Sequence, residues 1–257
     1  MPESSGGAKS SPGGKVPDGV VWAEGMSNVY AVQEADATYI IDTGSSKGAE
    51  KVISTMASAG VRWESVKGIL LTHQHFDHVA GAARLKEMSK AQVAAHRLDA
   101  PAIEGKVPRV GMAMARMMRT VPVKVENVLE DGQTVGPFTV IHLPGHTPGT
   151  VAFLNKARGL LFTGDALVTG KSGKLALSRR MFNYDQEGAA ASLRKLMDVK
   201  PTAVFPGHGA VVVDNAADAL QEVVKRLTSP PEPYYPTTFG PEGRPELHPG
   251  LPGWKGQ

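Results

Sequence analysis

The sequence predicts an α/β domain, in which strands and helices alternate along the chain. Short apolar runs, most of them ending at Gly, Pro, Asp or His, alternate with amphipathic stretches of helical spacing. Hydrophobic residues make up 41% of the 257 residues, which is enough to build a sizeable core. No apolar run approaches the length of a transmembrane helix.

Eight apolar runs are predicted as strands, because each is short and most end at a residue that favours a turn. They cover residues 28–32, 38–42, 68–72, 92–96, 138–143, 150–154, 159–163 and 203–206. Five amphipathic stretches are predicted as helices from the spacing of their apolar residues. They cover residues 48–59, 79–88, 109–119, 187–197 and 215–227.

Both ends of the chain are predicted to be appendages of a central domain that spans residues 20–228. Residues 1–19 are rich in Gly, Ser, Pro and Lys, and they indicate a flexible leader without the apolar core of a secretory signal. Residues 229–257 contain eight prolines, too many for a helix or a central strand. This tail also holds four aromatic residues, Tyr234, Tyr235, Phe239 and Trp254. It is therefore either a strap packed on the domain or an extended tail.

Composition excludes several kinds of site and partner. The chain has no cysteine, so disulfides, thiolate zinc sites, iron–sulfur clusters and thiol nucleophiles are excluded. The net charge is +3, with Lys and Arg scattered along the chain, which argues against a nucleic-acid partner. Without a membrane segment or a secretory signal, we expect a cytoplasmic protein with no membrane partner. Nothing in the sequence indicates the oligomeric state.

The strongest chemical pattern follows the predicted strand at residues 68–72. Three imidazoles and one carboxylate stand within six positions, at His73, His75, Asp77 and His78. Imidazole nitrogen and carboxylate oxygen are ligands that suit Zn²⁺, and Mn²⁺ and Fe²⁺ are alternatives. Alternate residues of an extended chain point the same way, so His73 and His75 can share one ion. Asp77 and His78, past a bend, can then reach a second ion.

Three more candidate ligands, His146, Asp165 and His208, follow other predicted strands. Each comes directly after a glycine, which allows the backbone to approach an ion closely. Loops at the carboxyl ends of several strands are where α/β scaffolds usually assemble a site. The seven candidate ligands together fit two metal ions.

These residues resemble the metallo-β-lactamase superfamily. The resemblance rests on the His-x-His-x-Asp-His pattern from His73 to His78, on the Asp-Thr-Gly turn at Asp42 and on the order of the later ligands. It spans about residues 27–210 and implies an αβ/βα sandwich with two central mixed sheets flanked by helices. The ligand set implied by the resemblance is His73, His75 and His146 for one ion, Asp77, His78 and His208 for the other, and Asp165 as a bridge. Asp42 would orient ligands from outside the coordination sphere.

The resemblance implies a hydrolase of small-molecule substrates. Two divalent ions about 3.5 to 4 Å apart can share a water and lower its pKa to about 7, so that a metal-bridging hydroxide attacks the substrate. One metal would also polarise the substrate oxygen. Asp77 is the candidate catalytic residue, because it can orient the hydroxide and carry a proton to the leaving group. The expected reaction cleaves an ester, lactone, thioester or related bond.

Departures from the known branches narrow the substrate class. True metallo-β-lactamases lack the bridging aspartate, so Asp165 counts against a dedicated β-lactamase and leaves promiscuous activity open. Glyoxalase II enzymes add a helical domain that binds glutathione, where this chain has its Pro-rich tail. Acyl-homoserine lactonases place a tyrosine three residues after the bridging aspartate, where this chain has Val168. A mononuclear iron enzyme of the persulfide dioxygenase type is an alternative, and so is a binding protein, although no ligand is missing.

Residues outside the motifs receive less specific assignments, and no substrate-binding residue is identified. His142 is interpreted as structural, His96 as structural or at the edge of the site, and His248 has no assigned role. The Met-rich stretch 109–119 is predicted to pack in the core, with a lid over the site as the alternative. Residues 179–184 form a second candidate wall of the site, in which Tyr184 either packs or donates to a substrate oxygen.

Overall fold

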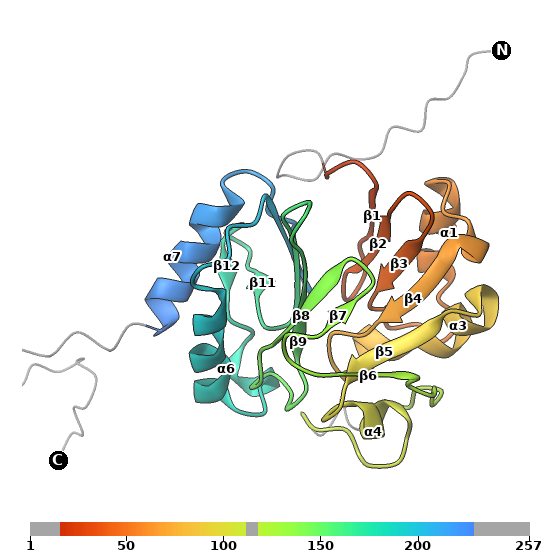
Figure 1. The fold of residues 1–257 in the computed structure, drawn as a ribbon. Coiled ribbons are helices and arrows are strands. Elements are labelled where there is room, and N and C mark those ends of the chain that lie inside the picture. The colour runs from red at the N-terminus through yellow and green to blue at the C-terminus, as the bar shows by residue number, and fades with distance from the viewer. Residues whose placement is uncertain (1–15, 112–117, 229–257) are drawn as a thin grey trace, which may run out of the picture.

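Two β-sheets lie face to face at the centre of the molecule, and helices cover the outer face of each sheet (Figure 1). The computed structural model describes residues 16–111 and 118–228. Within these residues the chain forms the αβ/βα sandwich expected from the sequence, so the predicted fold class is confirmed. None of the helices in the described parts is long and apolar enough to cross a membrane.

The first sheet has six strands in the order β1-β2-β3-β4-β5-β6. They are β1 (Val20–Ala23), β2 (Val29–Gln33), β3 (Thr38–Ile41), β4 (Val66–Leu70), β5 (Gln92–His96) and β6 (Asn127–Leu129). β1, β2 and β3 pair antiparallel, whereas β3 to β6 pair in parallel. The parallel pairing brings the carboxyl ends of β3, β4 and β5 to one edge of the sheet.

The second sheet has five strands in the order β13-β10-β9-β8-β7. They are β7 (Thr134–Val135), β8 (Phe138–His142), β9 (Val151–Asn155), β10 (Leu160–Gly164) and β13 (Ala203–Pro206). β10 and β13 are parallel, and both β8 and β10 run antiparallel to β9. The carboxyl ends of β8, β10 and β13 therefore share one edge. A separate hairpin consists of β11 (Val168–Thr169) and β12 (Leu175–Ala176).

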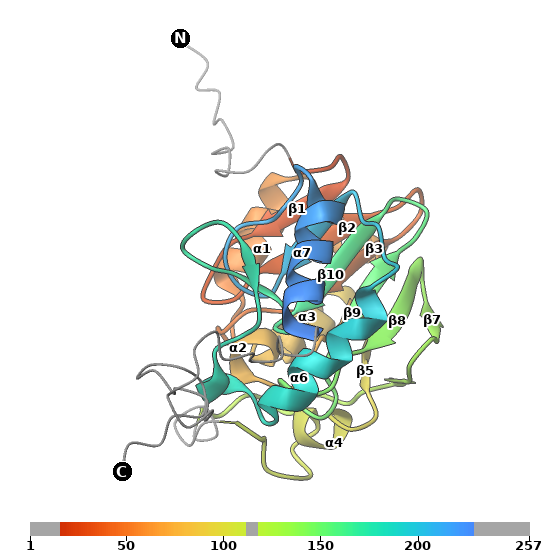
Figure 2. The same ribbon diagram turned by 90° about the vertical axis from the view of Figure 1, so that its left-hand side faces the viewer.

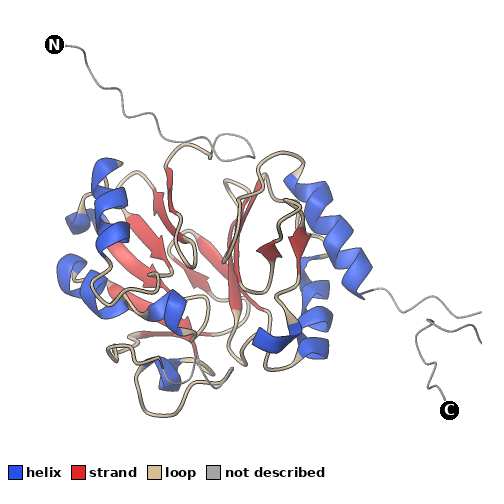
Figure 3. Ribbon diagram, turned by 180° about the vertical axis from the view of Figure 1, so that it is seen from behind, coloured by secondary structure: helices blue, strands red, loops and turns tan. Residues whose placement is uncertain are grey.

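Helices cover the two outer faces of the sandwich, as Figure 3 shows from behind. The first sheet is covered by α1 (Glu50–Ser58) and α3 (Ala82–Ser89). The second sheet is covered by α6 (Gln186–Ser192), η3 (Leu193–Leu196) and α7 (Ala216–Thr228), and α6 and α7 lie in front of it in Figure 2. The remaining short elements are η1 (Trp63–Ser65), α2 (Phe76–Val79), α4 (Ala100–Ile103) and η2 (Arg180–Phe182).

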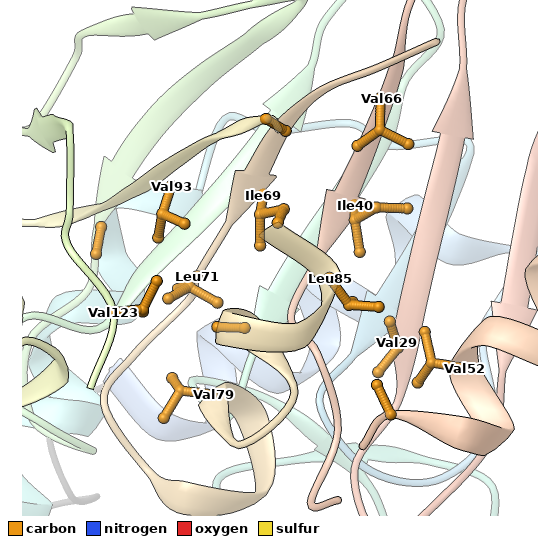
Figure 4. Packing of buried hydrophobic residues seen from close by; sticks show 14 of the residues in the cluster. Val29, Ile40, Val52, Val66, Ile69, Leu71, Val79, Leu85, Val93 and Val123 are labelled. Atoms are coloured by element: carbon orange, nitrogen blue, oxygen red, sulfur yellow. The ribbon is translucent and has the colours of Figure 1, made fainter. Parts of the chain in front are cut away.

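Three buried clusters hold the layers together, because successive residues of a strand point to opposite faces of its sheet. In β4, Ile69 packs toward α1 and α3, where Figure 4 shows it beside Ile40 and Leu85. Its neighbour Leu70 packs between the two sheets. Phe162 of β10 also lies between the sheets, stacked on Phe205 with ring centroids 4.4 Å apart. Burying each such side chain stabilises the fold by roughly 1.5–3 kcal/mol.

The structure confirms most predicted elements and moves some boundaries. Every predicted strand lies within two residues of an observed one. The sequence reading missed β1, β6, β7, β11 and β12, which contain two to four residues and are defined by their pairing partners. The predicted helix 79–88 begins only at Ala82, after the separate turn of α2. Helix α7 begins at Ala216, because Asn215 adopts a left-handed conformation with φ of 50°.

Parts of two predictions concern residues outside the described ranges. The Pro-rich tail lies outside them entirely, and so does the leader up to residue 15. Val16, at the end of the leader, packs against the cluster between the sheets. The predicted helix 109–119 falls largely on residues 112–117, which are not described, and its described ends have no helical structure.

Candidate metal centre

All seven predicted ligands lie together where strands of both sheets end. His73 and His75 follow β4, and Asp77 and His78 stand in the short helix α2 directly after them. The other three ligands come from the second sheet: His146 from the loop between β8 and β9, Asp165 after β10 and His208 after β13. The shared edge thus gathers side chains that are up to 135 positions apart in sequence, from His73 to His208.

The imidazoles form two groups that share this edge. In the first group, His73, His75 and His146 have ligand atoms within 4.8 Å of one another. His75 Nδ1 and His146 Nε2 are only 2.9 Å apart. The second group, Asp77, His78 and His208, meets the same limit. Each group offers three ligand atoms, as one metal ion with an open position for water or substrate requires.

Asp165 lies between the two groups. Its Oδ2 is 3.3 Å from His146 Nε2 on one side and 3.3 Å from His208 Nε2 on the other. Its Oδ1 is 3.3 Å from His78 Nε2. Within the described residues, Asp165 therefore contacts imidazoles of both groups, which is the position that a bridging carboxylate requires.

Hydrogen bonds outside the cluster determine which ring nitrogen of each histidine carries the proton. Asp42 Oδ2 lies 2.8 Å from His78 Nδ1, and Asn183 Oδ1 lies 2.8 Å from His146 Nδ1. Because these oxygens are acceptors, each Nδ1 is protonated and each Nε2 keeps its lone pair. Thr72 Oγ1 donates to Asp42 and lies 3.0 Å from His73 Nδ1, with the same consequence for His73. Three lone pairs therefore face the interior of the cluster.

Asp42 also ties the motif to the end of β3. Its Oδ1 accepts the backbone N–H of Thr72 at 2.8 Å, and Thr72 directly precedes His73. Asp42 is buried and has a φ of 59°, which is uncommon for a residue with a side chain. Its carboxylate lies where the sequence placed an orienting residue, outside the ligand set and against His78.

The side chains of the cluster fit metal ions better than they fit a hydrogen-bond network. His73 Nε2 is buried and has no hydrogen-bond partner within the described part of the chain. An unsatisfied buried polar atom of this kind costs about 1–3 kcal/mol. His146 Nε2, which keeps its lone pair, faces His75 Nδ1 at 2.9 Å. A divalent cation would satisfy these nitrogens together, and the nitrogen and oxygen donor set suits zinc, iron or manganese.

Charges within the cluster shift the pKa values of its members. Burial raises the pKa of Asp165, but His78 and His146 hold it well below its ordinary value. Burial also raises the pKa of Asp77, and His78 and His208 more than offset this increase. Burial lowers the pKa of His208, yet hydrogen bonds to Asp165 and Asp77 raise it to about 9 overall. Both carboxylates are therefore ionised near neutral pH, and their negative charge attracts a cation.

The cluster opens to solvent on one side. The side chain of His208 is 32% exposed and that of Asp77 is 14% exposed, whereas His78 and His146 are buried. The backbone N–H of Tyr184 donates to His146 O at 3.1 Å, so the segment 179–184 passes beside the first group. Its large side chains Met181, Phe182 and Tyr184 are exposed, and Tyr184 does not pack into the core.

Glycines around the cluster allow its loops to approach one another. Gly207, which precedes His208, donates its N–H to Gly164 O, and its carbonyl accepts the N–H of Asn28. A Cβ added to Gly207 would lie 2.1 Å from Asp165 Oδ1. The side chain of Asn28 also donates to Pro206 O and Gly209 O, which holds the His208 loop from both sides.

Several residues that support the site were not identified from the sequence. Thr72, Asn183 and Asp99 contact ligands or the loops that carry them, and Gln74 stands between two ligands. Thr72 and Gln74 belong to the motif segment, so their position was a signal that could have identified them. Asn183 was placed only in a candidate wall, and Asp99 carries no sequence signal because its partners lie in other loops.

His96 and His142 lie outside the ligand groups. Their rings stack, with centroids 3.9 Å apart, and His142 Nε2 bonds to Pro148 O at 2.8 Å. His142 therefore has the structural role predicted for it. His96 is buried in this pair instead of lining the cluster, which leaves the structural one of its two predicted alternatives.

Known proteins resemble this chain in sequence. The family model described as the metallo-beta-lactamase superfamily matches residues 22–208. The "Probable metallo-hydrolase YflN" of Bacillus subtilis is 27% identical over 234 residues, which cover 79% of this chain and 89% of that protein. A "Hydroxyacylglutathione hydrolase" of Cereibacter sphaeroides is 37% identical over 154 residues, which cover 60% of this chain and only 52% of that enzyme. Both names describe hydrolases, the enzyme class expected from the sequence.

Solved structures resemble the fold. The crystal structure of TTHA1623 in a di-iron-bound form has a TM-score of 0.61 and 32% identity, and the match covers 79% of this chain and 94% of that one. BJP-1, a subclass B3 metallo-beta-lactamase of Bradyrhizobium japonicum, has a TM-score of 0.64 at 21% identity, with 83% and 89% covered. The family match extends over most of the described sandwich and includes every ligand of the cluster. This chain therefore belongs to the metallo-β-lactamase superfamily.

Proposed function

We propose that this chain is a hydrolase with two divalent metal ions, zinc first, that cleaves an ester, lactone, thioester or related bond in a small molecule. The observation that carries the proposal is the position of Asp165. Its carboxylate lies 3.3 Å from nitrogens of His146 and His208, which belong to different groups. A carboxylate between two groups of three ligands suits a pair of ions about 3.5 to 4 Å apart.

The proposed ligand set follows the two groups. The first ion is assigned to His73, His75 and His146, the second to Asp77, His78 and His208, with Asp165 between them. Bound there, the ions supply Lewis acidity and a water of lowered pKa. The protein supplies orientation, because Asp42 and Asn183 hold the rings of His78 and His146 with their Nε2 atoms facing inward.

Asp77 is assigned the proton-transfer role. Its Oδ2 lies 3.3 Å from His208 Nε2, and its side chain is more exposed than those of the fully buried ligands. Because its pKa lies below the ordinary value, it is ionised and able to accept a proton from the attacking nucleophile. The same carboxyl group can then deliver that proton to the leaving group. This assignment depends on Asp77 being at the opening, where substrate enters.

The substrate is proposed to be compact. It would enter beside His208 and Asp77, with the exposed Met181 and Phe182 available on the neighbouring segment. The hydroxyacylglutathione hydrolase relative supports a thioester as one candidate, although this chain matches only about half of that enzyme. The likeness to BJP-1 concerns the fold and leaves β-lactams as a minor candidate.

The first test combines metal content with a substrate panel. We expect two ions per chain in metal-replete protein, and hydrolysis that a chelator abolishes and zinc restores. The panel contains an activated aryl ester, a lactone, a glutathione thioester, a cephalosporin, a phosphodiester and a structured RNA. Aryl esters or lactones should be turned over fastest. Iron in both positions would change only the metal assignment, for which the di-iron form of TTHA1623 is a precedent. One iron per chain with oxygen consumption would overturn the proposal.

A second test concerns the bridge. We expect Asp165→Ala to lower the affinity for both ions, because Asp165 contacts imidazoles of both groups. The affinities are measured by competition with a chelator. Asp198→Ala, at an exposed position after η3, is the control and should bind two ions as the wild type does. Unchanged occupancy of both sites in Asp165→Ala would contradict the bridging assignment.

A further inference from the structure

The most completely hydrogen-bonded carboxylate near the centre belongs to Asp99, which is not a candidate ligand. Asp99 follows β5 and is fully buried. It stands at the N-cap of α4, where aspartate commonly accepts backbone N–H groups of the first helical turn. The side chain of Asp99 makes no such capping bond. Its two oxygens are directed instead to two loops that carry proposed ligands.

The first of these loops is the His-x-His segment. Asp99 Oδ2 accepts the backbone N–H of Gln74 at 2.8 Å, and Oδ1 accepts the side-chain Nε2–H of the same residue at 2.8 Å. Gln74 stands between His73 and His75, so this double contact holds the short segment that presents both imidazoles. Gln74 Oε1 also accepts the N–H of Val110 at 2.9 Å, and the neighbouring Gly111 packs against His75 Nε2.

The second loop is the one that carries His146. Asp99 Oδ2 accepts the hydroxyl of Thr147 at 2.6 Å, and Oδ1 accepts the N–H of Gly149 at 2.9 Å. A Cβ added to Gly149 would lie 2.6 Å from Asp99 Cγ, so the approach depends on glycine there. Each oxygen of Asp99 thus accepts one hydrogen bond from each loop.

We propose that Asp99 is a positioning residue of the metal centre, which sets His75 of one loop against His146 of the other. The inference rests on the proposed function, because it treats both imidazoles as ligands of the first ion. The effect reaches the ligands through their chain neighbours, since Gln74 adjoins His75 and Thr147 adjoins His146. With Asp99 in place, His75 Nδ1 and His146 Nε2 stand 2.9 Å apart, close enough to share one ion.

Asp99→Asn removes this function with little change in shape. An amide has one acceptor oxygen, and its NH₂ group must replace either Oδ1 or Oδ2. In one orientation the NH₂ faces the backbone N–H of Gln74, and in the other it faces that of Gly149. Neither backbone donor can become an acceptor, so one donor pair is always mismatched. One of the two loops is therefore released.

The test measures the two metal affinities separately. Zinc dissociation constants are obtained by chelator competition, and the absorption spectrum of the cobalt-substituted protein reports ligand geometry. Repeating the titration in a His208→Ala background, which retains the first group, assigns the constants. For Asp99→Asn we expect the first-site affinity to fall by about 10- to 100-fold and the second-site affinity to change less. The cobalt spectrum should change at the first site.

Two further variants keep the test decisive if Asp99→Asn folds poorly. Thr147→Val removes one donor to Asp99 and should weaken the first site, and Thr147→Ser, which keeps the hydroxyl, should restore it. Asp131→Asn is the matched control, because Asp131 bonds to His142 N and Lys195 and to neither ligand loop. Its metal affinities should equal those of the wild type.

The possible results separate this inference from the proposed function. A wild-type chain that binds no metal would overturn both. A wild-type chain with two ions would support the proposed function. If Asp99→Asn and Thr147→Val then left the first-site affinity and the cobalt spectrum unchanged, the positioning role alone would be rejected. Equal weakening of both sites by both variants would also reject it, because general destabilisation would explain that result.

Discussion

Gly207→Ala is expected to abolish productive metal binding while leaving the sandwich folded. The new Cβ would lie 2.1 Å from Asp165 Oδ1 and 3.0 Å from His78 Cε1. The backbone at this position cannot withdraw easily, because it is bonded to Gly164 on one side and to Asn28 on the other. Asp165 must therefore move out of the position between the two groups. We expect the metal affinity to fall by at least about 100-fold, as for loss of a strong supporting contact.

Metal content and turnover of Gly207→Ala are measured together with its circular dichroism. The matched control is Gly170→Ala, because Gly170 has no positive φ and a Cβ there would be 3.9 Å from its nearest neighbour, Lys174 O. Gly170→Ala should bind two ions and retain full turnover. If Gly207→Ala retained two ions at wild-type affinity, the close approach of this loop to Asp165 would not be required.

Asp77→Asn is expected to reduce turnover strongly and in a way that depends on the leaving group. The amide keeps the size of the side chain but loses the charge and the ability to accept a proton. Proton transfer by a positioned group contributes about 10²- to 10⁴-fold in rate, and disturbing a ligand adds to the loss. Substrates with poor leaving groups need a proton as the bond breaks, so they should lose most. Activated aryl esters and strained lactones should lose least.

The measurement compares turnover by Asp77→Asn on aryl esters of increasing leaving-group pKa, with the metal content determined in parallel. Asp198→Asn changes an exposed aspartate outside the cluster in the same way and should behave as the wild type. Equal losses for every leaving group, with both ions still bound, would contradict the proton-transfer role. Turnover only on structured RNA would reject the proposed substrate class.

The positions of the main strands were predictable because they depend on local patterns. The run before His73 is apolar and short, so its assignment as a buried strand did not require knowledge of the partner strands. β6 and β7 were missed because two or three residues cannot establish a period. Their pairing with β5 and β8 defines them, and that pairing is a tertiary property.

The candidate ligands were identifiable because their residue types and their places after strands are written in the sequence. Three imidazoles and a carboxylate within six positions are informative without coordinates. The same reading could rank His146, Asp165 and His208 as candidates because each follows an apolar run and a glycine. It could not establish that Asp165 lies between the groups, since that depends on distances across two sheets.

By itself, the sequence determined the α/β class, the seven candidate ligands and the family resemblance, since each depends on neighbours in the chain. Only the tertiary structure decided what supports them: Asn183 on His146, Thr72 on His73, and Asp99 between two loops. Asp99 meets partners 25 to 50 positions away, at Gln74 and Gly149. A hydrogen bond depends on distance and direction in space, and chain separation of this length constrains neither. Such contacts are established only when the strands pair and bring the loops to one edge.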